Sequence, residues 1–211
     1  MSKIYKYAVI IESVRYTNGI QIIIEIMQQL INYIEQFVKL DKETIQTLMD
    51  LAEFESYKKN QHILEQGQYC NKIWFIVKGM VRKYHILDGK EITAWIHTEN
   101  DTFTSLQSYA QNIPSVEFLQ ACETCEVISI SRSNSEKLAS FPQIMIFSNE
   151  LMRREFANID KHTKALNSKD AKGKYEYLRE IAPEMIKRGK LGHIASIIGV
   201  TQETLSRIRK G

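Results

Sequence analysis

The sequence contains few of the features that mark secreted, membrane-spanning or disulfide-bonded proteins. Its three cysteines are an odd number and follow no secretory hydrophobic segment, which indicates a reducing cytoplasm. The most apolar runs, residues 7–11 and 20–26, are short and interrupted by charged residues, so none can span a bilayer. We therefore expect a cytoplasmic protein with no membrane partner.

Metal-ligand clusters are also scarce. An iron–sulfur cluster needs four thiolates, and the spacing Cys122-x-x-Cys125 supplies two, with Cys70 far away in the sequence. Two interpretations of that pair remain: Cys122 in a strand core with Cys125 in the following turn, or a redox-sensing pair. A cupin-type metalloenzyme needs a cluster such as His-x-His with a carboxylate, whereas the histidines here are scattered. We expect no metal, no cofactor and no enzymatic activity. The histidines are His62, His85, His97, His162 and His193.

Positive charge is concentrated at the C-terminal end. The net charge is +3, but residues 161–211 hold 12 Lys/Arg against 5 Asp/Glu, which leaves the first 160 residues acidic. A basic segment beside an acidic one indicates a polyanionic partner for the C-terminal part.

The apolar pattern changes along the chain from helical to strand-like and back. Residues 27–54 repeat at three and four, with a break at residues 40–42 where Asp41 can cap the second helix. Asp88-Gly89 joins two strand-like runs and predicts a tight hairpin. Many short strands with regular turns favour an antiparallel barrel or jelly roll. The expected strands are 73–77, 80–87, 91–97, 116–122 and 126–131.

A heptad pattern follows Pro142, which is either a break or a first-turn residue of the expected helix. Apolar positions alternate at four and three over about three repeats, interrupted by Asn149 and Thr163. A second copy of the same helix is the simplest partner for this seam; packing of the stripe on the chain's own β-domain is the alternative. The expected dimer-interface residues are Met145, Met152, Phe156, Ile159 and Leu166.

The N-terminal 26 residues are rich in Ile and Tyr but show little helical or strand order, in contrast to the pattern that opens at Met27. Two hypotheses account for them. Either Met27 is the biological start, or residues 1–26 form an extra helix or strand that covers the first domain.

The last 21 residues carry the strongest pattern, that of a helix-turn-helix. Ala195 is the small residue at the helix crossing, Gly199 suits a positive φ in the turn, and Thr201 stands at the N-cap of the second helix. Inward positions are apolar, whereas the outward ones carry Gln, Glu, Ser and Arg, which can meet base edges and phosphates. A solvated helical hairpin that closes a domain is the alternative. The inward residues are Ile194, Ile198, Val200, Leu205 and Ile208.

Taken in order, these segments resemble the Crp/Fnr family of bacterial transcription regulators over roughly residues 30–211. The residues that carry the resemblance are Gly67, the strand and turn of residues 73–79, Asp101 with Phe103, and the final helix-turn-helix block of residues 194–208. The resemblance implies an α+β fold: an N-terminal antiparallel β-roll (jelly-roll-like) sensor domain, a long dimerisation helix and a C-terminal helix-turn-helix. The corresponding domains are an uncertain extension (1–26), a cyclic-nucleotide-binding-like β-roll (27–142), the dimerisation helix (143–168) and the DNA-binding domain (169–211).

The resemblance also implies a homodimer on a palindromic operator. In the Fnr-like branch Glu, Ser and Arg read bases, and Glu203, Ser206 and Arg207 match them here. It suggests TTGA-like half-sites, with double-stranded DNA, a second copy and RNA polymerase as partners. The sequence ends at Gly211, so we expect Arg209 and Lys210 to supply backbone contacts beyond the recognition helix. The full expected DNA-binding set is Thr201, Gln202, Glu203, Ser206, Arg207, Arg209 and Lys210.

The expected ligand segment departs from the cyclic-nucleotide pattern. Family members that bind cAMP use Phe-x-Gly with Glu, and later Arg-Ser; here Leu106 cannot accept from a ribose hydroxyl and Pro114 carries no charge. Of that set Ser115 remains, so we expect no response to cAMP and either another small-molecule effector or none. The alternatives are a β-roll sensor in which DNA binding is secondary and an interaction module that has lost DNA binding. The ligand-segment residues are Phe103, Ser105, Leu106 and Ser115.

Overall fold

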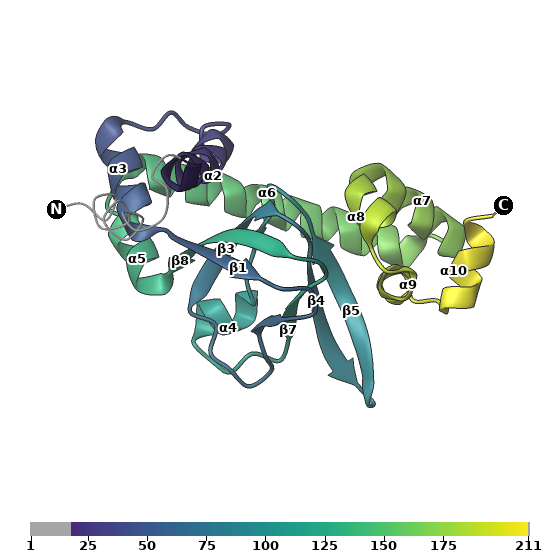
Figure 1. Cartoon of the computed structure of the whole chain (residues 1–211). Coiled ribbons are helices and arrows are strands. Elements are labelled where there is room, and N and C mark those ends of the chain that lie inside the picture. Colours follow the sequence, from purple (N-terminus) through teal and green to yellow (C-terminus); the bar gives the residue numbers. More distant parts are fainter. Residues whose placement is uncertain (1–17, 211) are drawn as a thin grey trace.

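The computed structural model describes residues 18–210, and the side chains of residues 25–210. N-terminal helices, a β-roll, one long helix and a C-terminal group of helices follow one another along the chain (Figure 1). This order confirms the expected α+β architecture. What was expected for residues 1–17 lies outside the described residues.

Two antiparallel sheets form the β-roll. Within residues 18–210, eight strands make two four-stranded sheets with the orders β1-β8-β3-β6 and β2-β7-β4-β5. The strands are β1 (Glu53–Tyr57), β2 (His62–Leu64), β3 (Lys72–Lys78), β4 (Val81–Leu87), β5 (Lys90–His97), β6 (Thr102–Phe103), β7 (Phe118–Ala121) and β8 (Cys125–Ser131).

The core of the roll lies between the sheets, where alternate strand residues point inward. Trp74, Ile76, Leu119 and Val127 are buried there. The β4–β5 hairpin turns at Asp88-Gly89, as predicted. Asp88 has a φ of 50° and Gly89 a φ of 73°, the left-handed pair that a two-residue hairpin turn needs.

Helices α2 (Asn18–Ile34), α3 (Lys42–Leu51) and α5 (Arg132–Leu138) pack beside the first sheet, at the N-terminal end of the molecule (Figure 1). Leu30, Ile34 and Leu48 are buried against Phe75 and Ile128 of that sheet. The Asp41 carboxylate caps α3 by accepting from the Thr44 amide at 2.8 Å, as predicted. The expectation of little helical order before Met27 is wrong for residues 18–26, because α2 begins at Asn18. Its Ile-rich sequence hides the helical period, whereas the burial of Ile26 and Met27 fixes the helix.

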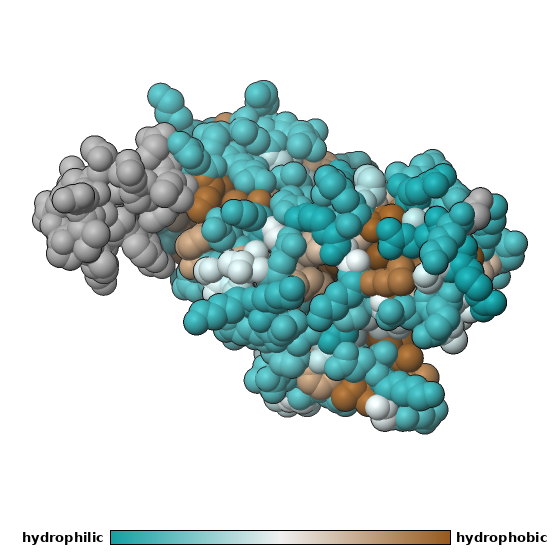
Figure 2. Space-filling model, turned by 45° about the vertical axis from the view of Figure 1, so that its right-hand side comes forward, coloured by the Kyte–Doolittle hydropathy of each residue, from teal (hydrophilic) through white to brown (hydrophobic). Residues whose placement is uncertain are grey.

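The long helix α6 (Pro142–Ser168) begins one residue before the expected start, with Pro142 in its first turn, and leads to the C-terminal domain. That domain contains α7 (Ala171–Ile181), α8 (Pro183–Arg188), α9 (Leu191–Ile198) and α10 (Gln202–Ile208). Figure 2 shows mostly hydrophilic side chains over one face of the molecule, with smaller hydrophobic patches between them.

The sequence pattern did not predict several short elements. Strands β1, β2 and β6 and helix α4 (Leu106–Gln111) were not predicted, since each is too short to show a period. The interpretation that places Cys122 in a strand core and Cys125 in the following turn is wrong. Cys125 is the buried residue, in β8, while Cys122 is half-buried in the turn after β7, because β8 begins one residue earlier than predicted and pairs Cys125 with Tyr57.

Candidate nucleic-acid interface

The C-terminal domain contains a helix-turn-helix built as the sequence predicts. Ala195 and Ile198 of α9 and Leu205 of α10 are buried where the two helices meet. Gly199 ends α9 with a φ of 74°, and the Val200 amide donates to the Ala195 carbonyl at 3.0 Å. The glycine is needed because residues with a side chain rarely adopt this backbone conformation.

The N-terminus of α10 is capped by Thr201. Its hydroxyl accepts from the Thr204 amide at 3.2 Å. Glu203 and Arg207 are exposed on the opposite side from buried Leu205, Gln202 is exposed in the first turn, and Ser206 is half-buried. The helix therefore presents one amide, one carboxylate and one guanidinium to solvent on a rigid element.

The exposed groups carry opposite charges. Hydrogen bonds from the Glu203 backbone amide and the Thr201 hydroxyl lower the pKa of the Glu203 carboxyl, and Arg207 lowers it further. The Arg207 guanidinium lies 3.4 Å from the Thr204 hydroxyl and is otherwise exposed. Arg209 and Lys210 follow at the exposed C-terminal end of the helix. At neutral pH the surface thus offers an ionised acceptor and several cationic donors.

The second expected surface is the seam on α6. Met145, Met152, Phe156 and Ile159 are 43–59% exposed. Leu166 differs, because it is half-buried against the C-terminal core. In a single chain most of the seam therefore contacts water, which leaves an apolar stripe along the helix.

The ligand-segment residues lie at the roll end that carries α4. Phe103 is buried and stacks on Trp74, with ring centroids 5.4 Å apart. The hydroxyls of Ser105 and Ser115 lie 2.9 Å apart, and Ser105 donates to the Glu117 carboxylate at 3.1 Å. Leu106 is 44% exposed at the start of α4. Both serines are therefore occupied by protein groups, with a carboxylate among them.

No group of three or more His, Cys, Asp or Glu in residues 18–210 is arranged to hold a metal ion. Within the same residues, no helix is long and apolar enough to cross a membrane. Burial raises the pKa of the Cys122 thiol and raises that of Cys125 to about 11. Raised thiol pKa values oppose thiolate formation, which disfavours the redox interpretation of this pair.

The model of the cyclic nucleotide-binding domain family matches residues 54–140. No curated protein sequence matches the chain. Similar solved structures include FixK2 from Bradyrhizobium japonicum, at 24% identity over 75% of this chain and 83% of that one, with a TM-score of 0.61. A Crp/Fnr-family transcriptional regulator from Eubacterium rectale is 19% identical over 85% and 86%, with a TM-score of 0.62. The Thermus thermophilus catabolite activator protein is 18% identical over 82% and 84%, with a TM-score of 0.52.

The chain has the fold of a Crp/Fnr-type regulator. Within this Crp/Fnr fold, sequence analysis missed two charged groups. Glu117 accepts a hydrogen bond from Ser105 of the expected ligand segment, and Arg188 joins the C-terminal domain to the β-roll through Glu99 and Glu123. Nothing in the sequence pattern singles out either group, because their partners come from distant segments.

Proposed function

We propose that this protein is a sequence-specific DNA-binding transcription regulator that acts as a homodimer. The exposed face of α10 is the observation that carries the proposal. A buried Leu205 and a capping Thr201 fix the helix, while Glu203 and Arg207 point into solvent. Such a helix fits the major groove, which accepts one α-helix and displays a distinct set of donors and acceptors for each base pair.

The chemistry of each side chain suggests its target. The Arg207 guanidinium can donate twice to one guanine, and the ionised Glu203 can accept from a cytosine amino group. Ser206 is half-buried and suits a single hydroxyl contact. These roles agree with the TTGA-like half-site that the resemblance implies.

Phosphate contacts are assigned to groups at the two ends of α10. Thr201 and Gln202 lie at its N-terminus, where the helix dipole favours an anion. Arg209 and Lys210 lie at its C-terminal end. Such contacts give affinity that falls with salt but no sequence choice.

A dimer through α6 supports reading of a palindrome. The exposed seam of Met145, Met152, Phe156 and Ile159 is the kind of stripe that a second copy covers. Two recognition helices would then meet major grooves about 34 Å apart on one face of the duplex. The transcriptional regulators among the similar structures agree with this role, and RNA polymerase is a further partner that it implies.

We do not expect the β-roll to respond to cyclic nucleotides. A cyclic phosphate needs cationic or amide donors, whereas Ser105 and Ser115 bond to each other and to Glu117. A carboxylate at that position repels a second anion.

Selection of bound duplexes from a random DNA library tests the proposal. We expect a two-fold symmetric site with guanine at one position of each half. Arg207→Ala should weaken binding by about 1–3 kcal/mol and relax the choice at that guanine. The matched control is Arg179→Ala, at an exposed position of α7, where the arginine pairs with Glu176 of the same helix. Equal losses on selected and random DNA would mean that Arg207 contacts phosphate only.

A further inference from the structure

The C-terminal domain is docked on the β-roll. Helix α9 packs against β5, the edge strand of the second sheet, and the Thr93 amide of that strand donates to the Ser196 hydroxyl at 2.9 Å. Met185 of α8 is fully buried with Met80 and Ile96 of the roll. The two parts therefore share an apolar contact, and the C-terminal domain accepts a hydrogen bond from a backbone amide at the edge of the sheet.

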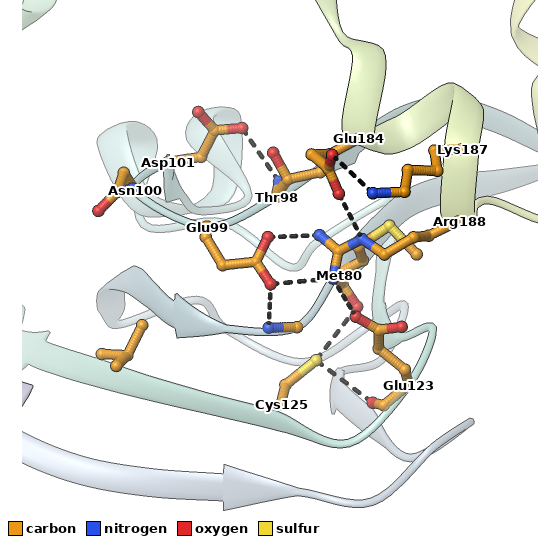
Figure 3. Close-up of polar contacts among 12 residues, drawn as sticks. Met80, Thr98, Glu99, Asn100, Asp101, Glu123, Cys125, Glu184, Lys187 and Arg188 are labelled. Carbon is orange, nitrogen blue, oxygen red and sulfur yellow. Dashed lines mark hydrogen bonds and ion pairs between the residues drawn. The ribbon is translucent and has the colours of Figure 1, made fainter.

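Arg188, the last residue of α8, adds a charged contact beside the apolar one (Figure 3). Its guanidinium donates to Glu99 Oε1 at 2.9 Å and to Glu123 Oε1 at 2.7 Å, and it also pairs with Glu99 Oε2. Its Nε lies 3.2 Å from Glu184 of its own helix. Arg188, Glu99 and Glu123 are called the Arg188 cluster below.

The two carboxylates of the Arg188 cluster come from different turns of the β-roll. Glu99 follows β5, and its carboxylate also accepts from the Gly79 amide at 2.8 Å. Glu123 lies in the turn between β7 and β8. Gly79 brings these turns together, since a Cβ there would lie 2.7 Å from the Thr124 carbonyl oxygen. The Glu99 carboxylate is thus held in place by a backbone amide of the β-roll, whereas the Glu123 carboxylate bonds to Arg188.

The connection between the domains is short, and one set of contacts joins the domains beside it. Helix α6 ends at Ser168 and α7 begins at Ala171, so two residues join them. Trp95 of β5 stacks on His162 of α6, with ring centroids 4.9 Å apart, and His162 bonds to the Tyr177 hydroxyl of α7. These contacts lie at the start of the domain, whereas the Arg188 cluster lies at the end of α8.

We propose that Arg188 is a positioning residue for DNA recognition, which holds the helix-turn-helix in one orientation on the β-roll by bridging Glu99 and Glu123. This rests on the proposed function. In a dimer joined through α6, the orientation of each domain sets the distance between the two recognition helices. A fixed orientation therefore restricts the spacing of half-sites that one dimer can bind. Loss of the cluster widens that range.

The first test needs no DNA. Amide hydrogen exchange of residues 90–97 is compared between the wild type and Arg188→Gln, because the Thr93 amide is protected by the docked α9. We expect exchange about threefold to tenfold faster in the variant, with unchanged exchange in the α9–α10 core. Arg179→Gln, which breaks a pair within α7, should leave residues 90–97 unchanged.

Rescue variants separate positioning from a merely structural role. Arg188→Lys keeps the charge but loses the two-point contact with Glu99, so partial restoration is expected. Arg188→Glu combined with Glu123→Arg restores one opposite-charge pair across the domains and should slow exchange relative to Arg188→Glu alone. If Arg188 acts only through Glu184 on its own helix, adding Glu123→Arg to Arg188→Glu leaves exchange in β5 as fast as in Arg188→Glu alone, and the proposal fails.

The second test uses duplexes whose half-site spacing varies by one base pair at a time. The wild type should prefer one spacing, and Arg188→Gln should bind neighbouring spacings with a smaller penalty. A wild type that binds no selected DNA would refute the proposed function. The exchange test would still decide whether Arg188 holds the C-terminal domain on the β-roll. The positioning role would be overturned if the wild type prefers one half-site spacing and Arg188→Gln shows the same preference with the same penalty at neighbouring spacings.

Discussion

The exposed seam of α6 gives a prediction whose size follows from the structure. Phe156 is 59% exposed, and an aromatic side chain presents about 200 Å². Burying the exposed part of one Phe156 side chain against a second copy removes about 120 Å² from water. At about 25 cal/mol per Å², this stabilises the dimer by about 3 kcal/mol. Both protomers contribute, so Phe156→Ala should cost the dimer up to about 6 kcal/mol.

A loss of that size raises the dimer dissociation constant by up to about 10⁴-fold. Sedimentation of the wild type and of Phe156→Ala over a range of concentrations measures it. Phe54→Ala is the matched control, since Phe54 is 44% exposed but lies on β1, away from the seam. A wild type that stays monomeric at high concentration, or a variant that dimerises as tightly as the wild type, would refute the account of α6.

Three further predictions concern stability and ligand choice. Burial, aided by the charges of Arg82 and Lys190, lowers the pKa of His193 to about 4; the unfolded chain therefore binds a proton below pH 6.5 that the folded chain does not. Urea unfolding should show stability falling by up to about 3 kcal/mol from pH 7 to pH 4, less so in His193→Gln. Gly199→Ala should lower the free energy of unfolding by about 1 kcal/mol, because Gly199 has a positive φ that alanine adopts with strain. Gly192→Ala within α9 should leave the stability unchanged or raise it. Chemical denaturation that finds Gly192→Ala the more destabilising of the two would contradict the role given to Gly199 in the turn. Cyclic AMP at about 1 mM should leave the midpoint of thermal unfolding unchanged, because Ser105 of the expected ligand segment is bonded to the Glu117 carboxylate. A clear upward shift of the midpoint would mean that the nucleotide binds.

Elements of the C-terminal part and one hairpin of the β-roll were predictable because their signals are local. Gly199, Thr201 and the Asp88-Gly89 turn each impose a backbone conformation that the sequence alone reveals, and Pro142 marks the start of α6. Long elements with a clear period, such as α6 and β5, were found within one or two residues of their ends.

What could not be predicted depends on contacts between distant segments. Strand β6 has two residues and exists because Phe103 and Thr102 pair with β3. The burial of Cys125 was missed because its register is set by β1. Arg188 and Glu117 acquire their roles from partners that only the tertiary fold brings close.

The measurement that tests the central claim most directly is the binding of Arg207→Ala and wild-type protein to a selected duplex and to its single-guanine variants. We expect tight wild-type binding to the symmetric site, loss of affinity when the guanine of either half-site is changed, and no such discrimination in Arg207→Ala. A wild type that binds selected and random DNA equally, at matched salt, would contradict the claim that α10 reads sequence.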